Sequence, residues 1–237
     1  MVRPPAGGTA AGRPTPKRLR TAKDRTASSQ AWLERQINDP FVAEARAKGY
    51  RSRAAFKLGE IDERFRLIRR GARVIDLGCA PGGWLQVAVE RGARAVVGVD
   101  LLAIDPIVGA VIVQADFTDP GCGDNLVRLL GGAPDLILSD MAPNTTGHRQ
   151  TDHLRIVGLV EAAVDFAFQV LPPGGALVCK AFQGGETKAL LSRLKAGFSA
   201  VRHVKPKASR TESSELYLLA TGFKGTAGKR GAAPATI

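Results

Sequence analysis

Short apolar runs separated by polar segments recur along this chain from residue 73 onward. Five of these runs reach a charged residue, and the five residues are Asp76, Asp100, Asp116, Asp140 and Lys180. Runs this apolar are typical of parallel strands that are buried on both faces. The carboxyl ends of such strands line the crevice where open α/β sheets bind ligands. We therefore predict that the five charged residues end strands at one edge of a sheet.

The segments between the apolar runs have helical periodicity, so strands and helices alternate along the chain. The predicted strands span 73–77, 95–100, 111–115, 135–139, 176–182, 199–206 and 215–223. The predicted helices span 29–38, 40–48, 52–67, 83–91, 122–130, 152–171 and 186–196, and Ser52 is the predicted N-cap of the third. This alternation predicts a doubly wound α/β sheet in which the last two strands form an antiparallel hairpin at an edge.

The two ends of the chain differ from the centre in composition. Residues 1–28 contain seven Lys/Arg, one Asp and four Pro without apolar periodicity. This pattern predicts a disordered basic arm, which either contacts RNA non-specifically or keeps the protein soluble. Gly, Ala and Lys dominate after Phe223. We therefore predict one folded domain over 29–223 and a flexible tail over 224–237.

The net charge of the chain indicates what kind of partner it binds. The net charge of the 237-residue chain is +12 and its isoelectric point is about 10.2. Such a surplus favours a polyanionic partner, most often a nucleic acid, over a basic protein without one.

The cysteines indicate a reducing compartment. Cys79, Cys122 and Cys179 form no CxxC pair and two of them fall in predicted core, so we expect buried reduced thiols with neither a disulfide framework nor a metal site. No apolar run approaches the roughly 18 residues of a membrane span, and no secretory signal precedes the domain. These features predict a cytoplasmic protein without a membrane partner.

A glycine-rich loop between the first strand and its helix is the strongest local motif. Gly78, Gly82 and Gly83 allow positive φ and close approach of a ligand to the backbone. The loop is not G-x-G-x-x-G and no G-K-[ST] follows it, which disfavours a pyrophosphate ligand. Trp84, directly after the loop, either packs near the ligand or covers the seam between helix and sheet.

Two acids then suggest which ligand fits. Asp100 lies about 20 residues after the loop, where an acid commonly binds ribose hydroxyls. Asp116, after the third strand, is placed to accept from an adenine amine. A nucleoside held without phosphates points to S-adenosylmethionine.

Five motifs together resemble the FtsJ (RrmJ, RlmE) family of ribosomal RNA 2′-O-ribose methyltransferases. They cover about residues 28–223 in the order of the family, and they are Ser52-Arg-Ala-Ala-Phe-Lys-Leu58, Asp76-Leu-Gly-Cys-Ala-Pro-Gly-Gly-Trp84, Ser139-Asp-Met-Ala-Pro-Asn144, Val178-Cys-Lys-Ala-Phe-Gln-Gly184 and Ser213-Ser-Glu-Leu-Tyr217. The resemblance implies a Rossmann-like class I methyltransferase with a seven-stranded, mostly parallel sheet in the order 3-2-1-4-5-7-6. It also implies a uridine in the A-loop of 23S ribosomal RNA as substrate, modified by a monomer on the assembled large subunit.

The resemblance also assigns roles to residues. It implies a catalytic set of Lys57, Asp140, Lys180 and Glu215. It implies S-adenosylmethionine as cofactor, held at Gly82, Trp84, Asp100, Asp116 and Asp140. The chain departs from the family pattern in its long N-terminal arm, at Cys79 and over residues 144–147, none of which removes a functional group.

The sequence leaves the chemistry of Lys180 open. Burial and a second lysine lower the pKa of a lysine, whereas neighbouring carboxylates raise it. Lys180 is therefore either a neutral base for the ribose hydroxyl or a charged group that orients it and stabilises the oxyanion.

The sequence also leaves the RNA and its contacts open. The basic residues expected to meet RNA are Arg51, Arg53, Arg64, Arg149, Lys205, Lys207 and Arg210. The rival functions are a relative acting on transfer RNA or on another ribosomal nucleotide, an amino-group methyltransferase, a nicotinamide dehydrogenase and a non-enzymatic RNA-binding module. The last three fit the motifs less well, because the N/D-P-P-[YF] and G-x-G-x-x-G signatures are missing and a plain binding module needs no charged crevice.

Overall fold

A computed structural model describes residues 30, 33–34, 36–143, 149–183, 187–210 and 213–225, with 149–153 as backbone. Within these residues seven strands form one sheet in the order β3-β2-β1-β4-β5-β7-β6. The strands are β1 (Arg73–Leu77), β2 (Ala95–Asp100), β3 (Val111–Gln114), β4 (Leu136–Ser139), β5 (Ala176–Phe182), β6 (Phe198–Val204) and β7 (Glu215–Phe223). The first five strands run parallel, and β7 lies antiparallel between β5 and β6.

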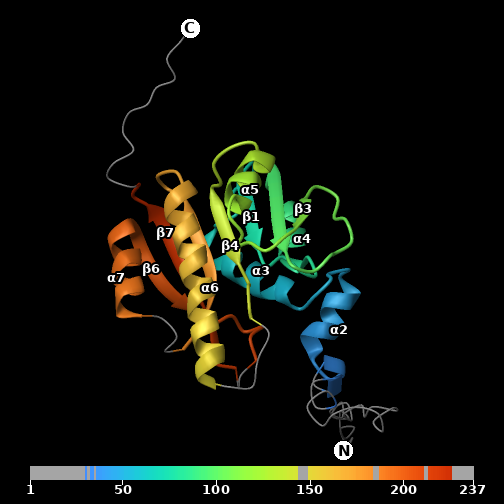
Figure 1. Cartoon of the computed structure of the whole chain (residues 1–237). Coiled ribbons are helices and arrows are strands. Elements are labelled where there is room, and N and C mark those ends of the chain that lie inside the picture. The colour runs from blue at the N-terminus through green and yellow to red at the C-terminus, as the bar shows by residue number, and fades with distance from the viewer. Residues whose placement is uncertain are drawn as a thin grey trace, which may run out of the picture.

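Helices cover both faces of this sheet (Figure 1). They are α2 (Pro40–Ala47), α3 (Ala54–Phe65), α4 (Gly83–Glu90), α5 (Cys122–Leu130), α6 (Arg149–Val170) and α7 (Lys188–Gly197). Buried side chains of α5, α6 and α7 pack on one face, and those of α3 and α4 pack on the other. The predicted doubly wound architecture is therefore confirmed, and the strand order is the one that the resemblance implied.

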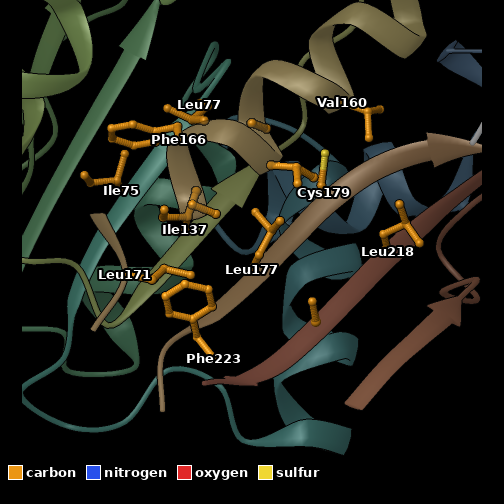
Figure 2. Close-up of a cluster of buried hydrophobic side chains, with 14 of the residues drawn as sticks. Ile75, Leu77, Ile137, Val160, Phe166, Leu171, Leu177, Cys179, Leu218 and Phe223 are labelled. Carbon is orange, nitrogen blue, oxygen red and sulfur yellow. The ribbon is translucent and has the colours of Figure 1, made fainter. Parts of the chain in front are cut away.

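The apolar runs form the core that their composition predicts. Figure 2 shows Ile75, Ile137 and Leu177 of three neighbouring parallel strands packed with Phe166 and other side chains of α6. All three cysteines are free and buried, as expected for reduced thiols. Within the described chain, no helix is both long and apolar enough to cross a membrane.

The predicted bounds of β1 and β5 are confirmed, but the expectation that all five charged residues end strands is wrong for two of them. β1 continues past Asp76 to Leu77, and the Asp76 side chain is buried inside the sheet. β5 continues past Lys180 to Phe182, because β7 pairs with it along its whole length. Asp100 does end β2, Asp140 directly follows β4, and Asp116 lies two residues beyond β3.

The starts of α2, α4 and α5 agree with the sequence prediction, whereas α6 begins three residues earlier and α7 two residues later than predicted, and α3 lacks the predicted cap. Asp39 caps α2 by accepting from the Phe41 N–H, and Thr187 caps α7 in the same way. The N-cap of α3 is Arg53, not Ser52 as predicted. The Ser52 hydroxyl faces Gly83 instead, where a Cβ would lie 2.5 Å from its oxygen, so this serine packs α3 against the start of α4.

The predicted end segments fall largely outside the described residues. The basic arm over 1–28 lies wholly outside them, and of the tail over 224–237 only residues 224–225 are described. Of the helix predicted over 29–38, residues 30, 33–34 and 36–38 are described. All of these are helical except Asn38, which lies in a turn.

Candidate active site

Two lysines and two carboxylates meet at the carboxyl edge of β4 and β5. The Lys180 Nζ lies 2.9 Å from Asp140 Oδ1 and 3.6 Å from Glu215 Oε2, and the Lys57 Nζ lies 2.5 Å from Glu215 Oε1. Glu215 opens β7 opposite Phe182, which places it diagonally across from Lys180 on the paired strand. Lys57 reaches the cluster from α3. The structure thus brings together all four residues that the resemblance proposed as catalytic.

Tyr217 is a fifth member of this cluster that the sequence analysis did not assign. Its side chain is fully buried, its hydroxyl donates to Asp140 Oδ1 at 2.9 Å and lies 3.3 Å from both Lys57 Nζ and Glu215 Oε1. Tyr217 lies two residues after Glu215 in β7, so both side chains project from the same face of the strand. That alternation was the signal in the sequence that could have found it.

Burial and opposite charges set the protonation of the cluster. Burial lowers the pKa of Lys180, but the attraction of Asp140 and Glu215 outweighs it, so the pKa lies above the ordinary lysine value. Burial raises the pKa of Glu215, but Lys180 and Lys57 lower it by more, and the net shift is downward. Lys180 is therefore an ammonium and Glu215 a carboxylate at neutral pH. Burial and both carboxylates raise the pKa of Tyr217 well above its ordinary value, so this residue remains a neutral donor.

The glycine loop is held in place by Asp100. The Ala80 N–H donates to Asp100 Oδ2 at 2.8 Å, and the Leu102 N–H donates to Oδ1 at 2.9 Å. Gly78 and Gly82 both have positive φ, at 75° and 110°. A Cβ on Gly78 would lie 2.9 Å from the Met141 Cα, which shows how closely the loop approaches the residue after Asp140.

Asp76 makes no side-chain hydrogen bond to the glycine loop that follows it. Its side chain is 1% exposed, and neither carboxylate oxygen has a hydrogen-bond partner among the described residues. Burial is the largest cause that raises the pKa of Asp76 well above the ordinary value, and repulsion from Asp140 and Asp100 adds to it. Asp76 is thus an unpartnered acid within the electrostatic range of both edge carboxylates.

The other two cofactor candidates lie on either side of this loop. The Trp84 ring is buried against Tyr217, and its Nε1–H donates to the Ala54 carbonyl, so the ring covers the seam between α3, α4 and the sheet. Trp84 can reach a ligand through its backbone N–H in the first turn of α4, where amides have no partner in the helix. Asp116 accepts from the hydroxyl and the backbone N–H of Thr118, which lowers its pKa.

Several basic residues expected to contact RNA instead form hydrogen bonds or ion pairs within the protein. Arg53 is largely buried and pairs with Asp39 and the Ala208 carbonyl, and Arg210 lies 3.6 Å from the same aspartate. Lys205 donates to the Ser213 carbonyl, and Arg51 binds backbone carbonyls. Arg64 and Lys207 are exposed, and the side chain of Arg149 lies outside the described part of the structure.

No group of three or more His, Cys, Asp or Glu side chains is arranged to bind a metal ion in the described residues.

Comparison with known proteins identifies the class of protein that this fold and site define. A family model described as FtsJ-like methyltransferase matches residues 50–223. A protein of Caulobacter sp. (strain K31), named Ribosomal RNA large subunit methyltransferase E, is 66% identical over 225 residues, which are 95% of this chain and 100% of that one. A protein with the same name from Gluconobacter oxydans (strain 621H) is 64% identical over 206 residues, which are 87% of this chain and 77% of that one.

A solved structure agrees with these relatives. A ribosomal RNA methyltransferase from Plasmodium falciparum aligns with a TM-score of 0.66 at 31% identity, over 75% of this chain and 100% of that one. The chain belongs to the FtsJ-like methyltransferase family, and it is a methyltransferase enzyme.

Proposed function

We propose that the chain transfers a methyl group from S-adenosylmethionine to the 2′-hydroxyl of a uridine in the A-loop of 23S ribosomal RNA. The observation that carries the proposal is the cluster of Lys57, Asp140, Lys180 and Glu215 beside the glycine loop. The relatives named Ribosomal RNA large subunit methyltransferase E support the choice of RNA.

The acids around the glycine loop fit a ligand that carries net positive charge. Asp76, Asp100 and Asp140 surround the loop, and Asp76 is buried without a counter-ion or hydrogen-bond partner in the described chain. Asp100 and Asp140 would repel phosphates and attract a sulfonium and an ammonium, and a positive ligand nearby would favour ionisation of Asp76. Leu101 and Leu102, 63% and 65% exposed directly after Asp100, provide apolar surface beside the acid, as an adenosine requires.

We propose the following cofactor contacts within this site. Asp100 and Asp116 accept from the ribose and adenine, while Gly82 and the backbone of Trp84 lie along the ligand. Asp140 lies between the cofactor side and the lysine cluster, because it follows β4 and contacts Lys180.

S-adenosylmethionine, when bound, supplies an activated methyl group on a positively charged sulfur. The residues of the cluster must then align the ribose hydroxyl and manage its proton, and such alignment is worth roughly 7–11 kcal/mol of the barrier. The Lys180 ammonium holds the hydroxyl oxygen and stabilises the negative charge that develops on it. Negative charge develops on the oxygen as its proton passes to the Asp140 carboxylate or to water. The oxygen would then bond to the methyl carbon while the methyl–sulfur bond breaks and sulfur keeps the electron pair.

The raised pKa of Lys180 favours this charged role over that of a neutral base in the cofactor-free protein. A positive ligand nearby lowers the pKa of a lysine, so the balance shifts toward proton transfer when the cofactor binds. Glu215 holds Lys57 and Lys180 in place, and Lys57 faces the incoming ribose or phosphate.

We further propose that the enzyme acts as a monomer in the cytoplasm, on the assembled large subunit. The side chains of Arg64 and Lys207 are exposed and suit contact with phosphates. Splayed single-stranded bases are the usual target of sequence-specific RNA recognition. The rival substrate is transfer RNA or another ribosomal nucleotide, since the motifs specify the chemistry more than the target.

The first test is Lys180→Ala, measured by methyl transfer from labelled S-adenosylmethionine to large subunits that lack the modification. We expect the rate to fall by at least the roughly 10²–10³-fold typical of a missing group that stabilises developing charge, with little change in cofactor affinity. Lys195→Ala removes an exposed lysine from α7 and should leave the rate unchanged. Wild-type turnover by the Lys180 variant would disprove the assignment.

The target nucleotide needs a separate test. Ribose-methylation mapping of total RNA from cells with and without the gene should show loss of one methyl group in the A-loop of 23S RNA. Loss from a transfer RNA, with the A-loop unchanged, would select the rival substrate.

A further inference from the structure

Arg51 connects three segments around the glycine loop. It lies between α2 and α3, its Nη1 is 2.6 Å from the Asp105 carbonyl oxygen and its Nη2 is 2.8 Å from that of Pro106. Its Nη1 also lies 3.4 Å from the Pro81 carbonyl oxygen, within the glycine loop. The guanidinium therefore bridges the glycine loop and the segment between β2 and β3.

The backbone of Arg51 is itself held in position by α4. The Arg51 N–H donates to Gln86 Oε1 at 2.8 Å, and the Gln86 Nε2 donates back to the Gly49 carbonyl at 2.9 Å. One side chain of α4 thus fixes the chain on both sides of Tyr50. The side chain of Arg51 starts from a rigid base.

The segment bridged by Arg51, residues 101–110, has no helix or strand of its own. It follows Asp100 and exposes Leu101, Leu102 and Val108, the last at 96%. In the described structure, the hydrogen bonds that reach residues 103–108 from other segments are the two from Arg51. The centre of this loop therefore depends on Arg51 for its polar attachment.

Packing at Gly82 supports the same attachment. A Cβ on Gly82 would lie 2.5 Å from Ile107 Cδ1 and 3.3 Å from Arg51 Cδ. Ile107 of the loop and the aliphatic stem of Arg51 thus converge on the glycine at the start of α4. The loop after Asp100 is closed down on the glycine loop by one apolar and two polar contacts.

We propose that Arg51 is a positioning residue for cofactor binding, which clamps the β2–β3 loop onto the glycine loop so that Asp100 and the leucines after it keep their place. The proposal rests on the proposed function, because that function places the cofactor at these two loops. It replaces the RNA contact that the sequence suggested for Arg51.

The geometry of the clamp requires arginine in particular. The planar guanidinium presents two N–H groups in a fixed fork to two successive carbonyls, whereas the ammonium of lysine is a single point on a flexible chain. Lysine keeps the positive charge that a phosphate contact needs. Arg51→Lys therefore separates a clamp from an RNA contact.

The test compares Arg51→Lys and Arg51→Ala with wild type in two titrations, one of S-adenosylmethionine and one of an A-loop RNA. Loss of two hydrogen bonds is expected to weaken cofactor affinity roughly tenfold in both variants. The lysine variant should bind RNA like wild type. Arg69→Lys, at an exposed position before β1, is the matched control and should change neither affinity.

Hydrogen exchange of the cofactor-free protein provides a readout independent of the ligand. Backbone amides of residues 103–108 should exchange faster in both Arg51 variants, while those of the sheet should not. Wild-type cofactor affinity and exchange in Arg51→Lys, with RNA affinity lost in Arg51→Ala, would overturn the clamp and restore an RNA contact. If wild type binds no S-adenosylmethionine, the proposed cofactor site fails and the clamp would be rejected as a cofactor device, whatever the exchange result.

Discussion

Asp76 has an energetic cost that depends on pH. In the folded protein, burial and the acids at the sheet edge raise its pKa, so the carboxyl holds its proton where an unfolded aspartate has lost it. The native state then binds more protons than the unfolded state. The contribution of this group to stability is present below the unfolded pKa of about 3.9 and falls as pH rises toward the folded pKa.

Asp76→Asn should remove this pH dependence. One group that titrates in the unfolded state alone changes the free energy of unfolding by about 1.4 kcal/mol per pH unit. We expect urea denaturation at pH values above about 4 to show a stability of wild type that falls more steeply with pH than that of the variant, until the folded pKa is reached. Parallel curves for the two proteins would show that Asp76 is ionised in the fold.

Tyr217 gives a second prediction at the scale of single residues. Tyr217→Phe keeps the ring against Trp84, at 5.5 Å between centroids, but removes the hydroxyl that donates to Asp140. With one donor lost from a buried carboxylate, we expect the methylation rate to fall about tenfold while cofactor affinity holds. The measurement is kcat and KM separately.

The other tyrosine of the chain is the control for this change. The Tyr50 hydroxyl donates to Glu90 at 2.6 Å, away from the cluster, in a cavity of about 850 Å³ between α2, α3 and α4. Tyr50→Phe should leave the rate unchanged. A Tyr217 variant with wild-type kcat would show that the hydroxyl only fills space.

These residues also show how far sequence predicts a site. Asp100 and Asp140 could be placed at strand ends from the apolar pattern alone, because hydrophobic runs report strands directly. The ion pair of Lys57 with Glu215 joins residues 158 positions apart, and no local pattern encodes such a contact. Only the family resemblance proposed Lys57 and Glu215 as site residues. The burial of Asp76 could not be predicted either, because it depends on how far the pairing of β1 with β2 extends.

At the scale of elements, the hydrophobic pattern predicted where strands begin and end better than it predicted their order in the sheet. The bounds of β1, β2, β5, β7 and α5 were predicted to the residue. The position of β7 between β5 and β6 was not encoded in periodicity, since an alternating strand fits an edge or an interior place equally well. That insertion is what carries Glu215 and Tyr217 to Lys180.

The turn at Gly78 makes a testable claim at this scale. Gly78→Ala places a Cβ at positive φ and 2.9 Å from the Met141 Cα, so either the glycine loop or the end of β4 must move. We expect the free energy of unfolding to drop by about 1–3 kcal/mol and cofactor affinity to fall with it. Chemical denaturation and ligand titration measure the two effects.

Gly59→Ala, in the interior of α3, is the matched control. A Cβ there would meet no heavy atom within 4 Å, and the helix gains from replacing glycine. This variant should be more stable by up to about 1 kcal/mol with unchanged cofactor affinity. Equal losses in both variants would mean that the contact with Met141 is not what restricts Gly78.

At the scale of the whole molecule, charge is unevenly distributed along the chain. Residues 1–28 hold seven Lys/Arg against one Asp, so they account for about half of the net charge of +12. In the described domain, Arg51, Arg53 and Arg210 are engaged with protein groups. We propose that the arm supplies a large share of the electrostatic attraction to RNA.

Deletion of residues 1–28 tests this division of labour. Each phosphate contact that is lost lowers the slope of log affinity against log salt by about 0.7–0.9 in magnitude. If the arm binds RNA, the shortened protein should bind more weakly at low salt and show a flatter slope, while its thermal stability and cofactor affinity match the full chain. An unchanged slope with reduced solubility would instead select the other interpretation of the arm, a solubilising leader. In that case exposed basic residues of the domain, such as Arg64 and Lys207, carry the attraction, and their removal should flatten the slope that the deletion left intact.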